Sequence, residues 1–121
     1  MKNLYYTVTN ALTGEIVANK VKIAQDFKSR SIGLLNRQSL EEGEGLLIKP
    51  CNAIHTFFMK FPIDVVFLSR SCEVVKIGRR LPVGRLYGLV WGAYMVLELK
   101  AGAVDTLNLN KRDKLKIDKN G

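Results

Sequence analysis

The 121-residue sequence contains little cysteine, histidine and proline, and it has no long hydrophobic run. Two cysteines and one histidine supply at most three ligands, too few for a structural zinc site. No stretch approaches the roughly 18 apolar residues of a membrane-spanning helix, so we predict no membrane span. The start of the chain lacks the apolar run of a secretory signal peptide. We therefore expect a cytoplasmic protein with reduced thiols.

Acidic residues are also scarce, since 11 Asp and Glu stand against 19 Lys and Arg and the net charge is +8. Such a surface attracts polyanions, although the same charge also serves solubility alone. The densest basic run, 111–116, is interrupted by Asp113 and Leu115. That pattern is typical of a solvated edge strand rather than of a polybasic arm. The charge therefore leaves nucleic acid open as a partner but supports it only weakly.

Short segments rich in β-branched and aromatic residues predict a mostly β fold. Turn residues at Asn10–Gly14 join the first two segments into a hairpin, and Pro62 breaks the long apolar stretch. Gly78–Leu86 reads as a loop. We expect one domain over residues 1–121, a β-sandwich or barrel-like fold with one short accessory helix. The expected strands are Leu4–Thr9, Glu15–Ile23, Gly45–Lys49, two or more within Ala53–Leu68, Glu73–Ile77, Tyr94–Lys100 and Asp113–Asp118.

The accessory helix is predicted to begin at Asp26, which is a good N-cap residue. Apolar and small residues then recur at helical spacing over two to three turns. Arg30 and Arg37 lie seven residues apart and so would share one helical face. Gly33 within the segment costs about 1 kcal/mol relative to alanine.

His55 is the only histidine, and it lies between Cys51 and Met59 in an apolar segment. On one unbroken strand these three side chains would share a face, but their Cβ atoms would lie about 13 Å apart at each step. No single metal reaches all three unless a turn folds the segment, so we predict no metal site. A structural histidine bonded to the backbone and a histidine in a ligand pocket both remain open.

Two carboxylates interrupt apolar strands. Asp64 follows Pro62 and precedes Val65, so it needs backbone donors or a cation if it is buried. Glu98 alternates with Leu97 and Leu99, which places it on the opposite face of its strand. Arg30 and Arg37 are the natural partners of Glu98 because guanidinium matches carboxylate geometry. The alternatives are an ion pair that ties helix to sheet and the wall of an anion- or sugar-binding pocket.

No nucleophile elbow, P-loop or dinucleotide-binding motif is present, so we predict no cofactor and give non-enzymatic functions preference. Exposed aromatics beside basic residues would favour RNA binding. Tyr5, Tyr6, Tyr87 and Trp91 are the candidates, although core packing explains them equally well.

The order of motifs resembles the domain-of-unknown-function 192 family of prokaryotes. The resemblance rests on Arg30-x-x-Gly-Leu-Leu-x-Arg37, on Gly45-Leu-Leu-Ile, on the element from Ile54 to Phe67 that contains Met-Lys-Phe-Pro-Ile-Asp-Val-Val-Phe, and on Val96-Leu-Glu-Leu-x-Ala-Gly102. It extends from about Val21 to Ile117. It implies a β-rich, sandwich-like single domain and no particular reaction.

Two features depart from the family pattern. Many relatives carry a signal peptide or lipid anchor, which this chain does not show, so an extracytoplasmic role is not expected here. Relatives tend to have Gly-Asp before the last strand, where this chain has Arg112-Asp113. Arginine resists the positive φ that glycine permits, so the turn there is expected to need another geometry.

Together these observations favour non-catalytic binding of a small polar or anionic ligand. The candidate site residues are Arg30, Arg37, His55, Asp64 and Glu98. A nucleic-acid accessory protein with a basic surface is one alternative, and an enzyme that uses His55 with a carboxylate is another. In a third, the polar residues only lock helix to sheet. The sequence predicts neither the ligand nor the oligomeric state.

Overall fold

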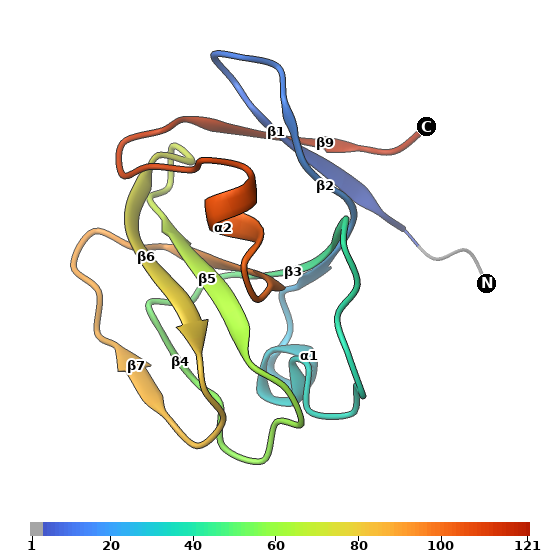
Figure 1. The fold of residues 1–121 in the computed structure, drawn as a ribbon, viewed down its shortest axis with the longest axis vertical. Helices are drawn as coiled ribbons and strands as arrows, with labels where there is room; N and C mark the ends of the chain where they lie inside the picture. Colours follow the sequence, from blue (N-terminus) through green and yellow to red (C-terminus); the bar gives the residue numbers. More distant parts are fainter. Residues whose placement is uncertain (1–3) are drawn as a thin grey trace.

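A seven-stranded, curled β-sheet organises the chain (Figure 1). The computed structural model describes residues 4–121, apart from the side chain of Phe27. The strand order is β6-β5-β8-β3-β2-β1-β9, and all neighbours are antiparallel except β2 and β3. In chain order the elements are β1 (Tyr6–Asn10), β2 (Ile16–Ala24), α1 (Phe27–Ile32), β3 (Glu44–Ile48), β4 (Ala53–His55), β5 (Ile63–Leu68), β6 (Val74–Leu81), β7 (Leu86–Gly88), β8 (Met95–Lys100), α2 (Ala103–Thr106) and β9 (Leu115–Lys119).

The two outer strands of this sheet, β6 and β9, meet at one end. An isolated bridge joins Glu73 to Lys114, and the Val74 amide donates to the Asp113 carbonyl at 2.8 Å. The sheet therefore curls into a half-barrel, which confirms the predicted mostly β, barrel-like fold. The strands β4 and β7 form a separate two-stranded sheet.

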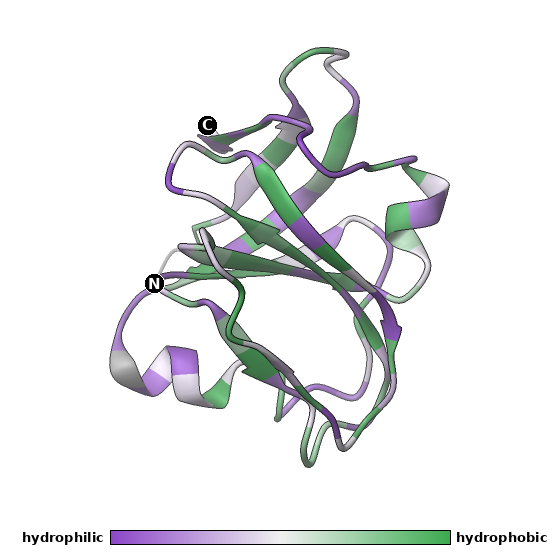
Figure 2. Cartoon of the chain, turned by 90° about the vertical axis from the view of Figure 1, so that its left-hand side faces the viewer, coloured by the Kyte–Doolittle hydropathy of each residue, from purple (hydrophilic) through white to green (hydrophobic). Residues whose placement is uncertain are grey.

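Apolar residues cover both faces of the sheet, and the alternation along each strand decides which face a residue serves. In β8, Met95, Leu97 and Leu99 belong to one buried cluster, whereas Val96 belongs to the other. The first cluster contains Val104 of α2 and is called the α2-side cluster; the second contains Leu34, which follows α1, and is called the α1-side cluster. Figure 2 shows hydrophobic strands between the two helices, which lie on opposite sides of the molecule.

The helix α1 starts where the sequence predicts but ends sooner. The Asp26 carboxylate accepts a hydrogen bond from the Ser29 amide at 2.7 Å, and this bond lowers the pKa of Asp26. Gly33 takes a positive φ of 50° and ends the helix after six residues. Arg37 therefore lies outside the helix and does not share a helical face with Arg30. Neither helix of the described residues is long and apolar enough to cross a membrane.

The loop expected over Gly78–Leu86 is shorter than predicted, because β6 continues to Leu81 and β7 begins at Leu86. Tyr87 of β7 stacks on Phe67 with ring centroids 5.6 Å apart. The sequence did not indicate β7 or α2, since three- and four-residue elements have no periodicity to recognise. The break at Pro62 is confirmed, with β4 ending at His55 and β5 starting at Ile63.

Arg112 keeps the geometry that glycine would favour. Its φ is 78°, which is in the left-handed region, so the different geometry expected for arginine at this position is not found. The Arg112 amide donates to the Val74 carbonyl at 2.7 Å. We attribute the positive φ of Arg112 to this hydrogen bond, which helps to join the chain before β9 to β6.

Candidate functional site

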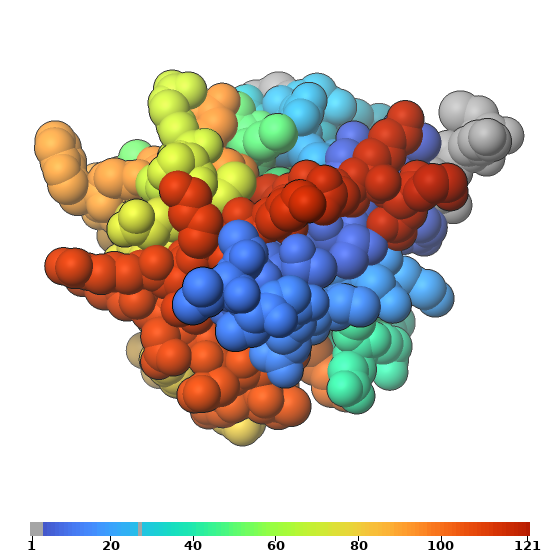
Figure 3. Space-filling view, turned by 90° about the horizontal axis from the view of Figure 1, so that it is seen from above, coloured from blue at the N-terminus to red at the C-terminus, as the bar shows by residue number. Residues whose placement is uncertain are grey.

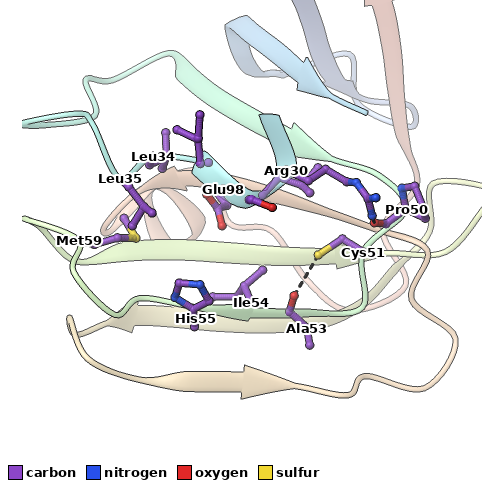
Figure 4. A pocket seen from close by; sticks show the side chains of 14 residues that line it. Arg30, Leu34, Leu35, Pro50, Cys51, Ala53, Ile54, His55, Met59 and Glu98 are labelled. Carbon is purple, nitrogen blue, oxygen red and sulfur yellow. Dashed lines mark hydrogen bonds between the residues drawn. The ribbon is translucent and has the colours of Figure 1, made fainter. Parts of the chain in front are cut away.

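A cavity of about 120 Å³ lies between α1, β4 and β8 (Figure 4). Arg30 and Leu34 line one side, Ile54 and His55 of β4 line another, and Glu98 of β8 reaches it from the sheet. A cavity of about 150 Å³ accommodates benzene. The space therefore suits a ligand of about six non-hydrogen atoms or fewer. The remaining lining residues are Ser31, Ile32, Gly33, Leu35, Ile48, Pro50, Cys51, Ala53 and Met59.

Glu98 is the buried acid of this cavity. Its side chain is only 4% exposed, and among the described residues no group donates a hydrogen bond to its carboxyl. Burial raises the pKa of Glu98 to about 7, because the charged form loses its hydration without gaining a partner. Figure 4 shows this carboxyl in the middle of the cavity. Glu98 is therefore partly protonated at neutral pH, and it can accept or donate a hydrogen bond there.

Arg30 supplies the cationic side of the cavity. Its Nη1 atom donates to the Pro50 carbonyl at 3.1 Å, which fixes the guanidinium against the chain after β3. Its Nε atom is buried and has no hydrogen-bond partner. No ion pair forms between Arg30 and Glu98; the ion pairs of the described residues lie elsewhere. The expected Arg30–Glu98 ion pair is therefore not formed. Instead, the Arg30 Nε donor and the Glu98 carboxyl are both left without a partner beside one cavity.

Cys51, His55 and Met59 all line this cavity, because the turn after β4 brings Met59 back to the side of Cys51 and His55. His55 is nevertheless exposed at the rim and stacks on Phe57 at 5.5 Å. The Cys51 thiol donates to the Ala53 carbonyl at 3.0 Å, and burial raises its pKa, as does the charge of Glu98. A raised pKa disfavours the thiolate that metals bind. No group of three or more His, Cys, Asp or Glu side chains in the described chain is placed to hold a metal.

Asp64 lies away from this cavity, on the face of β5 toward α2. It is fully buried, and its two carboxylate oxygens accept from the backbone amides of Arg80 at 2.7 Å and Val104 at 2.9 Å. These bonds join β5 to the end of β6 and to α2. The backbone donors that the sequence required for a buried Asp64 are thus present, and its role is to connect three elements.

Arg37 also lies away from the cavity. Its guanidinium pairs with Glu44 at 2.8 Å, and Glu44 also accepts from the Glu41 amide at 2.8 Å. Burial raises the pKa of Glu44, but these hydrogen bonds and the Arg37 charge outweigh it and lower the pKa overall. The expected Arg37–Glu98 contact is wrong, because the helix ends before Arg37. Of the five predicted residues, the structure brings Arg30, His55 and Glu98 together.

A larger depression of about 510 Å³ lies beside β2 and α2. Its charged residues Glu42, Arg80 and Lys100 are exposed, and Glu44 is paired with Arg37. Water already satisfies exposed charges, so a ligand gains little from them. The smaller cavity is the better candidate because its polar groups are buried and unsatisfied.

Sequence reasoning missed two residues of the cavity wall and one buried residue that follows it in the chain. Leu34 and Ile54 form its apolar walls, and nothing distinguishes them from ordinary core residues in the sequence. Thr56 is fully buried; its hydroxyl donates to the Pro82 carbonyl at 2.6 Å and accepts from the Arg85 amide at 2.9 Å. A threonine between His55 and Phe57 gives no sign of this role, because its partners lie more than 25 residues away.

Comparison with known proteins places these features in a family. The model of the DUF192 family, described as "Uncharacterized ACR", matches residues 8–117. A UPF0127 protein of Thermococcus sibiricus is 34% identical over 110 residues, which cover 88% of this chain and 71% of that protein.

Two solved structures share the fold. One is a Sinorhizobium meliloti protein whose description proposes a transcription regulator; it superposes with a TM-score of 0.80 at 21% identity and covers 93% of this chain and 92% of its own. The other is a protein of unknown function from Novosphingobium aromaticivorans, with a TM-score of 0.79, 20% identity and coverage of 92% and 82%. At such identities the likeness concerns the fold alone. With the family match over most of its length, the chain belongs to the DUF192 family.

Proposed function

We propose that this protein binds a small polar ligand, without chemical change, in the cavity between α1, β4 and β8. The observation that carries the proposal is the pair of unsatisfied groups beside one small cavity, the Glu98 carboxyl and the Arg30 Nε atom. Leaving buried polar groups unpaired costs about 1–3 kcal/mol each. A ligand that satisfies both groups would recover much of that free energy on binding.

The chemistry of the two groups restricts the ligand. It needs an acceptor for the Arg30 Nε–H and a group that exchanges a hydrogen bond with Glu98. An anion such as a small carboxylate fits if Glu98 is protonated, since two facing carboxylates share one proton. Anion binding would then take up a proton, which the Glu98 pKa of about 7 makes accessible at neutral pH. His55 at the rim would contact the outer end of the ligand.

The test uses backbone amide NMR spectra during titration with four probes of suitable size: acetate, glycerol, urea and ethanolamine. We expect at least one probe to shift the amides of Gly33, Cys51 and Ile54, and acetate to bind more tightly at pH 6 than at pH 8. Arg30→Met and Glu98→Leu should abolish these shifts.

Arg37→Met is the matched control, since it removes an arginine from the same segment but outside the cavity. It should leave the shifts unchanged. If no probe perturbs these amides, or if Arg37→Met weakens binding as much as Arg30→Met, the proposal fails.

A second candidate is acid–base catalysis, favoured by a carboxyl with a pKa of about 7 beside His55. A general acid or base works best when its pKa lies near the operating pH. Exposure of His55 and the absence of a hydrogen bond between it and Glu98 make this the weaker candidate. If a bound probe is chemically altered by the wild type but not by Glu98→Gln, this candidate replaces simple binding.

A further inference from the structure

Exposed apolar side chains gather along the two-stranded sheet of β4 and β7 and the loops that flank it, outside the cavity lining. Nine large hydrophobic residues are exposed in the described part of the chain, and six of them lie at 57–58 and 83–91. Trp91 is 97% exposed, Phe58 88%, Leu89 83% and Leu86 74%. We call this set the apolar rim: Phe57, Phe58, Val83, Leu86, Leu89 and Trp91.

Backbone pairing places the two segments of the rim side by side. β4 and β7 are antiparallel with His55 opposite Leu86, the Gly84 amide donates to the Thr56 carbonyl at 2.9 Å, and the Val90 amide donates to the Asn52 carbonyl at 2.9 Å. The segment before Phe57 therefore runs alongside the segment that carries Leu86 and Leu89. In Figure 1 these strands lie at the lower left, and in Figure 3 the loop after β7 projects from the surface in orange.

The charge around the rim has one sign. Residues 51–63 and 74–97 contain no aspartate or glutamate. Of their five cations, Arg79 pairs with Asp105 and Arg80 lies beside Gly102, so both reach toward α2. The other three are Lys60, Lys76 and Arg85, and none of them forms an ion pair in the described structure. Lys76 lies over the Tyr87 ring of β7 at 5.2 Å, so a positive charge borders the strand itself. Exposed apolar side chains are thus bordered by unpaired cations.

We propose that the apolar rim docks the protein on the surface of an anionic lipid membrane. Tryptophan favours the membrane–water interface, leucine and phenylalanine enter the acyl boundary, and lysine and arginine attract acidic headgroups. Self-association fits less well, because both copies would bring the same cations, Lys60 and Arg85, to the interface and neither would bring an acid to pair with them. Phe57, Phe58 and Trp91 offer rings on which bases could stack, but nucleic acid fits less well because the aliphatic half of the rim, Val83, Leu86 and Leu89, would stay exposed.

Trp91 is the only tryptophan, so its fluorescence reports directly on the rim. The experiment mixes the full chain with vesicles of phosphatidylcholine alone or with one quarter phosphatidylglycerol, and it measures co-sedimentation and Trp91 emission. We expect binding to the anionic vesicles, a blue shift of the emission, and quenching by brominated acyl chains. Neutral vesicles should bind at least about tenfold more weakly, as charge attraction supplies the initial contact.

Variants distinguish insertion from adsorption by charge. The double variant Leu86→Ser/Leu89→Ser should weaken binding at least about tenfold, because each leucine loses apolar burial in the membrane. Leu12→Ser is the matched control, since Leu12 is even more exposed, at 92%, but lies in the turn between β1 and β2, outside the rim. This variant should leave vesicle binding unchanged. Circular dichroism and urea unfolding check that each variant is folded.

Three results would overturn the proposal. The first is no binding to anionic vesicles. The second is binding without a blue shift that resists the double leucine variant, which would indicate adsorption through charge only. The third is quenching of Trp91 by a single-stranded RNA oligomer at concentrations where vesicles have no effect, which would assign the rim to nucleic acid.

Discussion

Asp64 and Glu98 are both buried acids on paired strands, yet their surroundings differ. Val65, the neighbour of Asp64, pairs with Glu98 in the register of β5 and β8. The side chain of Asp64 faces α2 and accepts two backbone hydrogen bonds. Glu98 faces the α1 side and receives none from the described residues, and its pKa is raised to about 7.

The difference shows how a structural acid can be distinguished from a site. A buried carboxylate with donors at both oxygens stabilises the fold, because its hydration is replaced by hydrogen bonds. A buried carboxyl without donors costs stability, and it persists where the surrounding packing holds it. Glu98 is of the second kind, and it borders the cavity that also contains Arg30.

The largest effect should come from Asp64→Leu, which leaves the amides of Arg80 and Val104 without acceptors. Two unsatisfied buried donors cost about 5 kcal/mol together. Urea unfolding at pH 7 measures the loss of unfolding free energy. Asp64→Asn keeps one acceptor oxygen and should lose about half as much. A loss below about 1 kcal/mol for Asp64→Leu would show that Asp64 does not hold these elements together.

The next largest loss of unfolding free energy should come from Phe67→Ala, in the buried cluster on the same side of the sheet as Glu98. Phe67 is fully buried in the α1-side cluster and stacks on Tyr87. Phe67→Ala should lower the free energy of unfolding by about 3–5 kcal/mol, since a large cavity is left behind. The same urea experiment checks this value. A loss under about 1 kcal/mol would mean that the α1-side cluster is not tightly packed and cannot offset the cost of burying an unpaired Glu98.

The pH dependence of stability should separate Glu98 from the other acids. Its pKa is raised in the folded state, so the folded protein binds the proton more tightly than the unfolded chain. The contribution of Glu98 to the free energy of unfolding is therefore fully present below about pH 4.5, and it is lost as the pH rises through about 7. Between pH 5 and pH 8 the wild type should lose about 2–3 kcal/mol.

Glu98→Gln cannot titrate, and unfolding curves at several pH values should show that this decline is removed. The pKa values of Asp26 and Glu44 are lowered in the folded state, so their contributions are lost only as pH falls, below this window. Equal slopes for wild type and variant would mean that Glu98 does not carry a raised pKa.

The smallest effect should come from Arg37→Met. Its ion pair with Glu44 is partly exposed, with 44% of the Arg37 side chain accessible. Exposed pairs contribute about 0–1 kcal/mol, so the free energy of unfolding should fall by less than about 1 kcal/mol. Urea unfolding at low and at moderate salt checks both the size and the screening. A loss of several kcal/mol would place Arg37 among the residues that hold the site.

Features with a local cause were predictable from the sequence. Asp26 caps a helix through a residue three positions away, and Pro62 interrupts a strand by its own geometry. The alternation of Glu98 with Leu97 and Leu99 predicted its face, because side chains alternate along any strand. For the same reason, Ile63, Val65 and Phe67 were predictable as core residues, and all are fully buried.

Features that depend on distant partners were not predictable in the same way. Asp64 receives its donors from the amides of Arg80 and Val104, which lie 16 and 40 residues away from it in sequence. Gly33 ends the helix and so keeps Arg37 off the helical face that carries Arg30. The sequence does not predict this end, because glycine can adopt either a helical or a positive φ. The cavity requires the turn after β4 to bring Met59 back toward Leu34 and Leu35, and no residue pattern in the sequence predicts that turn.

The most direct test is a ¹³C NMR titration of the Glu98 carboxyl carbon, assigned by comparison with Glu98→Gln. An unpartnered, buried carboxyl should titrate with a midpoint of about 7, well above the ordinary glutamate value. The addition of a probe that binds the cavity should then shift this midpoint. A midpoint near the ordinary value would contradict the account, because it would mean that Glu98 is solvated or paired and offers no unsatisfied group to a ligand.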